Sequence, residues 1–113
     1  DPTHPDTELG PMIDERASGR IDEWVRAAVS EGGRVLAGGQ ADGRFFEPTV
    51  IADAAPDSFV CSREAFAPIV TVFPASDWND ALSRINDSVF GLQAGVFTSN
   101  VEHAFQAFDR LDV

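Results

Sequence analysis

The sequence predicts an α/β fold in which a mostly parallel sheet is flanked by helices. Two observations carry this prediction. Residues 69–111 alternate between strand-like and helix-like segments in the order strand, helix, strand, helix, which is typical of a βαβ unit. Residues 69–73 form an apolar run without alternation, as expected for a strand covered on both faces. We therefore expect strands over 69–73 and 92–98 to be parallel and joined by a right-handed connection.

The clearest element is a helix over residues 14–31. Its apolar side chains recur every three or four residues, which is the pattern of one buried helix face. They are Ile13, Ala17, Ile21, Trp24, Val25, Ala28 and Val29. Asp14 suits the N-cap, and Gly32 with Gly33 suits the end of the helix.

Shorter patterns give the remaining elements. They are an irregular lead-in over 1–12, strands over 34–37 and 45–51, a loop over 52–58, and helices over 77–86 and about 100–111. Pro48 interrupts the second strand and indicates an edge or bulge position. The face of the last helix that we expect to turn inward holds Val101, Ala104, Phe105 and Phe108.

Composition limits the size and the partners of this protein. The chain has 113 residues, one cysteine and a net charge of −11, from 19 acidic and 8 basic residues. This length suits one domain over residues 1–113. The net negative charge opposes binding to nucleic acid or to an anionic membrane, because their phosphate groups repel an acidic protein. No apolar run is long enough to cross a membrane, and a single cysteine allows no internal disulfide, so we expect a cytoplasmic protein.

The stretch from residue 61 to residue 73 holds the candidate binding residues. Glu64 and Phe66 precede an apolar strand, and Pro68 marks the junction by restricting its own backbone and that of Ala67. On an extended chain, residues two apart point to the same side. A carboxylate and an aromatic ring on one side can bind a polar ligand that has a flat part. The alternative is a surface glutamate and a core phenylalanine.

Four motifs in this chain resemble the NAD(P)-dependent aldehyde dehydrogenase superfamily, in its order and at about its spacing. Arg-Glu-Ala-Phe-Ala-Pro-Ile-Val at 63–70 is similar to the family's Glu-x-Phe-Gly-Pro-Val stretch. The others are Asp-Pro-x-x-Pro-Asp-Thr-Glu-Leu-Gly-Pro at 1–11, Phe-Phe-Glu-Pro-Thr-Val at 45–50, and Asn-Asp-Ser-Val-Phe-Gly-Leu-Gln-Ala-Gly-Val-Phe-Thr at 86–98. The resemblance covers essentially the whole chain and implies the C-terminal portion of the family's catalytic domain.

The resemblance also implies a role for the candidate binding residues. The glutamate of the Glu-x-Phe motif, here Glu64, would bind the ribose hydroxyls beside the nicotinamide of NAD or NADP, and Phe66 would pack near the nicotinamide itself. Ala67 stands where the family commonly has glycine, so we expect the backbone there to be slightly less free than in the family. Asn86, Gly91 and Leu92 match the family pattern, and we assign them structural duties: a helix end, a turn and the start of a buried strand.

We expect no catalytic residue and no metal ligand in this chain. Cys61 lacks the Gly-Gln-x-Cys context of the family's nucleophile and has Glu64 nearby, so we interpret it as a buried structural thiol. The nucleophile would lie upstream, outside this sequence. Two isolated histidines are too few for a metal site or a catalytic triad, and we expect His103 to be exposed on the last helix.

The sequence thus predicts a fragment of an oxidoreductase that converts an aldehyde to a carboxylate with NAD or NADP, and that is inactive by itself. The complete enzyme would bind an aldehyde substrate and the nicotinamide cofactor, and we expect it to be a homo-oligomer. The alternative is a stand-alone, non-enzymatic binding or assembly module of the same descent. Both ends of the chain fall within the family's pattern, which favours the fragment.

Overall fold

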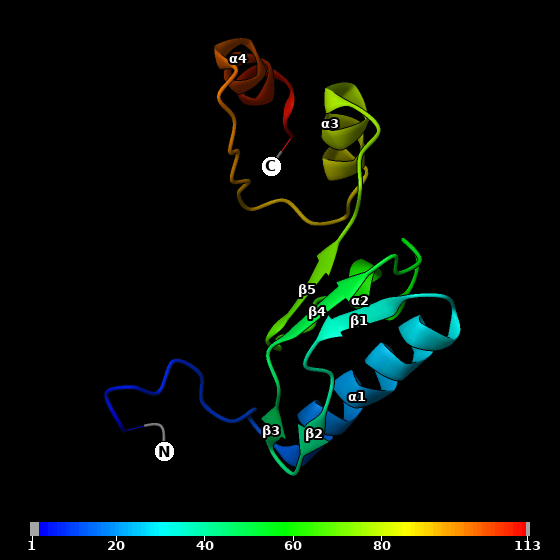
Figure 1. Ribbon diagram of the computed structural model, residues 1–113, viewed down its shortest axis with the longest axis vertical. Coiled ribbons are helices and arrows are strands. Elements are labelled where there is room, and N and C mark those ends of the chain that lie inside the picture. Colours follow the sequence, from blue (N-terminus) through cyan, green and yellow to red (C-terminus); the bar gives the residue numbers. More distant parts are fainter. Residues whose placement is uncertain (1–2, 113) are drawn as a thin grey trace. The chain divides into compact units, whose positions relative to one another are not determined.

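The computed structural model describes residues 3–112. It divides into two compact units, Asp1–Phe73 and Pro74–Val113. The first unit contains one long helix, α1 (Glu15–Ser30), two small sheets and a short helix, α2 (Phe59–Ser62) (Figure 1). The second unit contains the helices α3 (Trp78–Asn86) and α4 (Val101–Arg110). The expectation of one domain over residues 1–113 stays a prediction.

Helix α1 spans Glu15–Ser30 and confirms the clearest sequence prediction. The side chain of Asp14 caps it by accepting a hydrogen bond from the Ala17 backbone N–H at 2.7 Å. Its buried residues are Ser18, Ile21, Val25 and Ala28. Ile13 and Val29, which we expected on the buried face, are exposed, so the stripe that reaches the core is narrower than the sequence indicates.

The first unit holds a mixed three-stranded sheet. Its strands are β1 (Arg34–Ala37), β4 (Thr49–Ala52) and β5 (Ile69–Val72), in the order β1-β4-β5. Strand β4 pairs antiparallel with β1 and parallel with β5. The predicted α/β character is therefore correct, but the mostly parallel sheet is not what these residues form.

The predicted strand over 45–51 divides at Pro48, because proline supplies no N–H for a ladder. Strand β3 (Phe45–Phe46) pairs with β2 (Ala41–Asp42) in a separate two-stranded sheet, and β4 begins after the proline. Gly38 turns the chain between β1 and β2 with a φ of 67°. A Cβ at Gly38 would overlap the carbonyl oxygen of Pro48, so glycine is required there.

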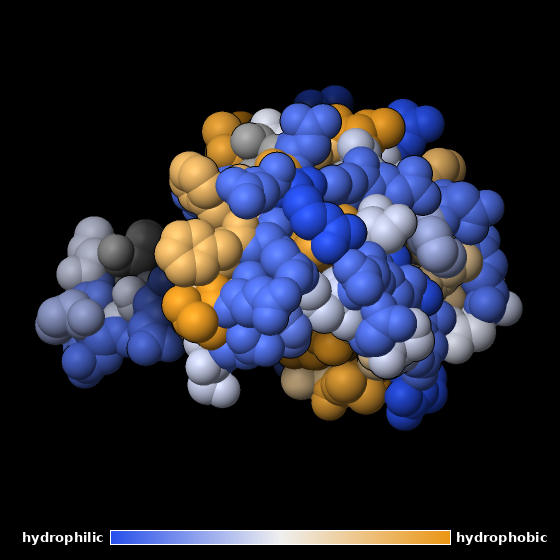
Figure 2. Space-filling view, turned by 90° about the horizontal axis from the view of Figure 1, so that it is seen from above, coloured by the Kyte–Doolittle hydropathy of each residue, from blue (hydrophilic) through white to orange (hydrophobic). Residues whose placement is uncertain are grey.

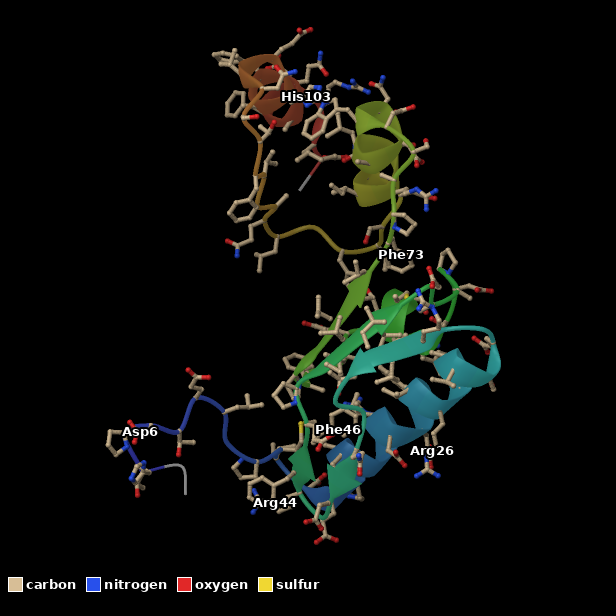
Figure 3. The ribbon with its side chains drawn as sticks, viewed as in Figure 1. Asp6, Arg26, Arg44, Phe46, Phe73 and His103 are labelled. Atoms are coloured by element: carbon tan, nitrogen blue, oxygen red, sulfur yellow. The ribbon has the colours of Figure 1, made fainter. Side chains whose placement is uncertain are left out.

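The core of the first unit lies where α1 packs against the strands. Eight buried residues form it: Met12, Ile21, Val25, Ala28, Phe46, Ile51, Ala54 and Val60. Phe46 projects from β3 toward α1 (Figure 3). The short helix α2 (Phe59–Ser62) lies on the connection between β4 and β5. Strand β5 lies at the edge of the sheet and is not covered on both faces as expected: Ile69 and Thr71 are half-buried, whereas Val70 and Val72 on the other face are exposed.

The second unit is a pair of helices, α3 (Trp78–Asn86) and α4 (Val101–Arg110). The Asn86 side chain joins them by donating to the Arg110 carbonyl at 2.7 Å and accepting from the Asp112 N–H at 3.0 Å. His103 on α4 stacks on the Trp78 ring, with centroids 4.4 Å apart and planes 4° from parallel. His103 is therefore half-buried rather than exposed as expected.

Two predictions for the second unit are wrong. Residues 92–98 form no strand in the part of the chain that the structure describes, and every one of them is exposed. An extended segment forms a stable strand only when it pairs with a neighbouring strand, and none of the described strands pairs with residues 92–98. Leu92 is 92% exposed, so it is not the start of a buried strand.

Helix α4 also turns a different face inward from the one we expected. Its buried residue is Ala107, while Val101, Ala104, Phe105 and Phe108 are exposed. Stacking of His103 on Trp78 and the Asn86 contacts at Arg110 select the inward face. Apolar residues consequently lie at the molecular surface, as the orange groups in Figure 2 illustrate.

Candidate cofactor-contact site

The candidate site is the segment from Arg63 to Pro68, called here the 63–68 segment, which links α2 to β5. It has no regular secondary structure. Pro68 fixes its end: the Ile69 N–H donates to the Ala67 carbonyl at 2.8 Å across the proline, and the Pro68 carbonyl accepts from the Thr49 N–H of β4 at 2.8 Å. The predicted junction at Pro68 is therefore correct, and it joins the segment directly to the central strand.

Phe66 is not extended. Its φ is 48°, in the left-handed region that bulky side chains seldom occupy. The argument that Glu64 and Phe66 share a side because the chain is straight is therefore wrong. A residue with a left-handed backbone turns the chain, so the direction of the Phe66 ring does not follow from that of the Glu64 side chain. The backbone strain of this conformation persists only where neighbouring residues hold it.

Both predicted residues face solvent. Phe66 is 79% exposed, so it does not belong to the core of the first unit. Glu64 is exposed as well, and within residues 3–112 its carboxylate takes part in no hydrogen bond or ion pair. A free carboxylate beside an exposed ring can accept hydrogen bonds from a diol while the ring contacts a planar group.

The neighbours of Ala65 hold this segment against α1. The Arg20 guanidinium of α1 donates to the Ala65 carbonyl at 3.0 Å and lies over the Trp24 ring at 5.0 Å. Ala65 and Ala67 pack against the core. The sequence interpretation missed Arg20, although its spacing of four residues from Trp24 places the two on one helix face.

Cys61 lies on α2 and is half-buried, where we expected a buried thiol. It packs against the core and accepts a hydrogen bond from the Ser58 hydroxyl, with oxygen and sulfur 3.4 Å apart. Among the residues that the structure describes, no histidine hydrogen-bonds to Cys61. The arrangement is that of a packed side chain.

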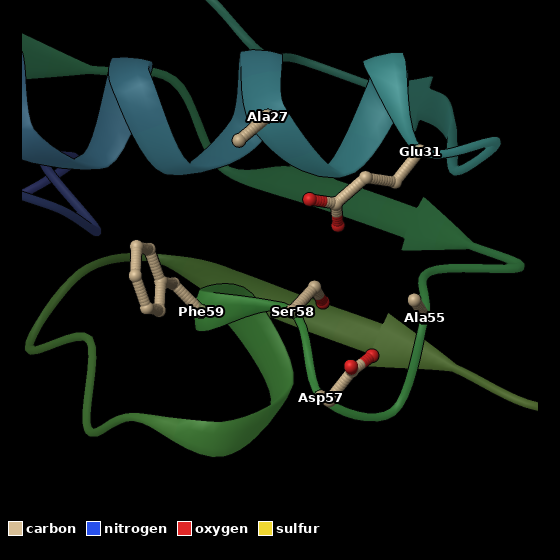
Figure 4. Close-up of a pocket in the computed structure, with 6 residues that line it drawn as sticks. All are labelled: Ala27, Glu31, Ala55, Asp57, Ser58 and Phe59. Carbon is tan, nitrogen blue, oxygen red and sulfur yellow. The ribbon is translucent and has the colours of Figure 1, made fainter.

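The structure contains a hollow of about 300 Å³ elsewhere in the first unit. Ala27 of α1 and Glu31, the residue that caps its C-terminus, line one side, and Ala55, Asp57, Ser58 and Phe59 line the other (Figure 4). Neither Glu64 nor Phe66 belongs to it. Its two acidic residues, Glu31 and Asp57, are exposed, and none of its lining residues belongs to the 63–68 segment.

Two other features limit the chemistry of the chain. Residues 3–112 contain no group of three or more histidine, cysteine or acidic side chains that could hold a metal ion. None of the helices described there is long and apolar enough to cross a membrane.

Two carboxyl groups have lowered pKa values, and both lie at helix starts. The pKa of Asp14 is below its ordinary value chiefly because the Ala17 backbone N–H donates to it. The pKa of Asp80 is lowered chiefly by its hydrogen bond from Arg84 and then by the Ser76 backbone N–H. These groups stabilise helix ends and lie outside the 63–68 segment.

The whole chain, residues 1–113, matches the model of the aldehyde dehydrogenase family. The chain belongs to the aldehyde dehydrogenase family. It is 38% identical over 112 residues to the 3-sulfolactaldehyde dehydrogenase of Priestia aryabhattai, a match that covers 99% of this chain and 24% of the relative. It is 36% identical over 115 residues to the NADP⁺ succinate-semialdehyde dehydrogenase of Deinococcus radiodurans, covering 99% and 24%.

Solved structures of aldehyde dehydrogenases share the fold. A Physcomitrella patens aldehyde dehydrogenase in complex with succinate superposes with a TM-score of 0.95 at 42% identity, covering 99% of this chain and 23% of that one. A Mycobacterium tuberculosis aldehyde dehydrogenase complexed with NAD⁺ has a TM-score of 0.86 at 29% identity, covering 96% and 24%. The chain therefore spans about a quarter of the length of the relatives it matches.

Proposed function

We propose that this chain is a portion of the catalytic domain of an NAD(P)-dependent aldehyde dehydrogenase and that its 63–68 segment contacts the nicotinamide end of the cofactor. One observation carries the proposal. Glu64 and Phe66 both face solvent on a short segment that is anchored to α1 and to β4. The exposed ring and the exposed carboxylate are therefore both accessible to a ligand, on a backbone that the rest of the first unit holds in place.

The residues present fit the cofactor chemically. The Glu64 carboxylate can accept two hydrogen bonds, which matches two neighbouring ribose hydroxyls. The exposed Phe66 ring offers a flat apolar surface to a heteroaromatic ring. Such contacts would fix the position of the nicotinamide relative to the substrate, and orientation of this kind contributes strongly to reaction rates.

The chemistry would be shared between this chain and the rest of the enzyme. When bound, the nicotinamide cofactor accepts a hydride from the aldehyde carbon. Glu64 and Phe66 would orient it, and the core of the first unit would hold them. By resemblance, the nucleophilic cysteine, the general base and the nucleotide-binding fold belong to other parts of the family's sequence, so this chain alone would be inactive.

The substrate class is proposed only as an aldehyde. Relatives of this chain are named for aldehydes of different charge, including 3-sulfolactaldehyde, succinate semialdehyde and betaine aldehyde. Solved relatives include both an NADP-dependent enzyme and a complex with NAD⁺. We further propose a cytoplasmic homo-oligomer, supported by the single cysteine and by the exposed apolar residues of the second unit.

Replacement of Glu64 by glutamine in the complete enzyme tests the proposal. Glutamine keeps the size of the side chain but removes the charge from its bonds to ribose, so hydride transfer should slow by about ten- to a hundredfold, equivalent to about 1–3 kcal/mol. Single-turnover formation of reduced cofactor measures this step. Glu23→Gln, on the exposed face of α1, is the matched control and should leave the rate unchanged. An unchanged rate in Glu64→Gln would remove Glu64 from the site.

A further inference from the structure

We infer that Arg20 of α1 is a positioning residue that sets the direction of Glu64 and Phe66. The inference rests on the proposed function, because it concerns the same 63–68 segment. Arg20 donates from Nη2 to the carbonyl oxygen of Ala65 at 3.0 Å. Ala65 is the residue between the two proposed contacts, so one hydrogen bond from a rigid helix acts on the backbone that carries both.

A line of stacked side chains holds Arg20 in place. Its guanidinium lies 5.0 Å from the centroid of the Trp24 ring, and the Trp24 and Phe59 centroids are 5.6 Å apart with planes tilted by 46°. The Arg63 guanidinium lies 5.3 Å from the Phe59 centroid. The segment is therefore held by its side chain at residue 63 and by its carbonyl at residue 65, on either side of Glu64.

The other arginines of α1 make different contacts. Arg16 pairs with Asp14 at 3.3 Å and Arg26 with Asp22 at 2.9 Å, so both form ion pairs near their own turn of the helix. Within residues 3–112, Arg20 forms no ion pair, and the contact it makes lies 45 residues away. A charged donor that contacts a distant backbone carbonyl orders that backbone, whereas a solvated surface arginine orders nothing.

The backbone at Phe66 explains why an anchor is needed. Phenylalanine with a φ of 48° is strained, and it would relax to an extended conformation unless the neighbouring residues prevented this. The Arg20 bond fixes the peptide unit just before Phe66, and the turn at Pro68 fixes the chain just after it. Loss of the Arg20 bond frees one of these two anchors and lets the ring move.

The test compares three variants in the complete enzyme. Arg20→Met keeps the side-chain stem but removes the donor, and it should slow single-turnover hydride transfer about tenfold or more, since small displacements of reacting groups are costly. Arg20→Lys should stay within about threefold of the wild type, because Arg20 makes a single hydrogen bond to the carbonyl, and an ammonium group can also donate one and lie over Trp24. Arg26→Met removes an arginine from the same helix and should have no effect. A merely structural arginine would not give this rescue by lysine.

Two further measurements separate the possible failures. Glu64→Gln is assayed alongside: if it slows hydride transfer and Arg20→Met does not, the positioning role is overturned and the proposed function stands. If neither variant slows hydride transfer, the proposed function itself falls. A crystal structure of Arg20→Met should show Phe66 with a negative φ, and an unchanged 63–68 segment would overturn the inference. Should Arg20→Met fail to fold, the shorter Arg20→Gln carries the same expectations.

Discussion

The two units of this chain differ in how far they bury their own apolar side chains. In the first unit, α1 and the strands enclose a continuous core, with Ile21, Ala28 and Ile51 fully buried. Among residues 74–112 of the second unit, only Leu82 and Ala107 are buried, and the apolar face of α4 is exposed. Both units match the same family over the full chain. Two units that match the same family can therefore differ in whether they bury enough apolar surface to be stable without further contacts.

The candidate site lies in the self-supporting unit. Glu64 and Phe66 are carried by a segment whose anchors, Arg20, Thr49 and Pro68, belong to α1, β4 and the segment itself. The second unit contributes none of these anchors. Precise placement of a binding residue needs a rigid support, and the first unit offers one.

The largest expected difference between the units is the stability lost when an apolar side chain is truncated. Ile51→Ala leaves a cavity in the centre of the first unit, where the wild-type residue is fully buried. The free energy of unfolding should fall by about 2–5 kcal/mol. Leu92→Ala in the second unit removes a side chain that is 92% exposed, and the change should stay within about 0.5 kcal/mol. Urea titration of both variants measures this, and equal losses would contradict the comparison.

Self-association is the second expected difference between the units. The isolated chain should form dimers or larger species, because Val101, Phe105 and Phe108 leave an uncovered apolar face on α4. Light scattering over a wide concentration range measures the mass. The double variant Phe105→Ser/Phe108→Ser should shift the mass toward the monomer, whereas Phe45→Ser in the first unit should not. A wild-type chain that is monomeric at all concentrations would contradict this prediction.

Acid should destabilise the N-terminal ends of α1 and α3, one in each unit. This effect should be smaller than the two described above. The folded pKa values of Asp14 and Asp80 lie below the ordinary 3.8, so the unfolded chain takes up protons first as the pH falls. Their contribution is present above about pH 4 and is lost as the pH falls through the folded pKa values. Helicity followed by circular dichroism should show this loss, and Asp14→Asn, which still caps, should reduce it.

Salt should distinguish the two helix starts. The pKa of Asp80 is lowered first by a hydrogen bond from the charged Arg84 side chain, whose attraction salt weakens, while that of Asp14 is lowered first by a backbone hydrogen bond from Ala17. The loss of helicity in acid that each carboxyl causes is measured as the part that its Asn variant removes. About 1 M salt should reduce the Asp80 part more than the Asp14 part. An equal effect of salt on both parts would contradict the assigned causes.

The sequence predicted those elements that depend on nearby residues. Helix α1 was predicted almost to the residue, because its cap at Asp14 and its apolar period are local. The strand over 92–98 and its parallel pairing were wrong, because strand pairing depends on a distant neighbour. The inward face of α4 was wrong for a similar reason: the stack of His103 on Trp78 sets it, and periodicity alone does not.

The candidate site was predicted in part. The resemblance to the family pointed to Glu64 and Phe66, and the structure places both at the surface. The left-handed backbone of Phe66 carries no sequence signal, because such a conformation usually marks glycine. Arg20 was missed because its partner is a backbone carbonyl 45 residues away, and no side-chain pattern identifies a carbonyl.

The central claim is that this chain supplies a cofactor contact and not the chemistry. The most direct measurement mixes the purified 113-residue chain with NAD or NADP and a panel of aldehydes, and follows reduced cofactor and cofactor affinity. We predict no turnover and an affinity in the millimolar range or weaker, about 4 kcal/mol at most, because Glu64 and Phe66 touch only one part of the dinucleotide. Turnover that persists through purification and disappears in Cys61→Ala would contradict the account.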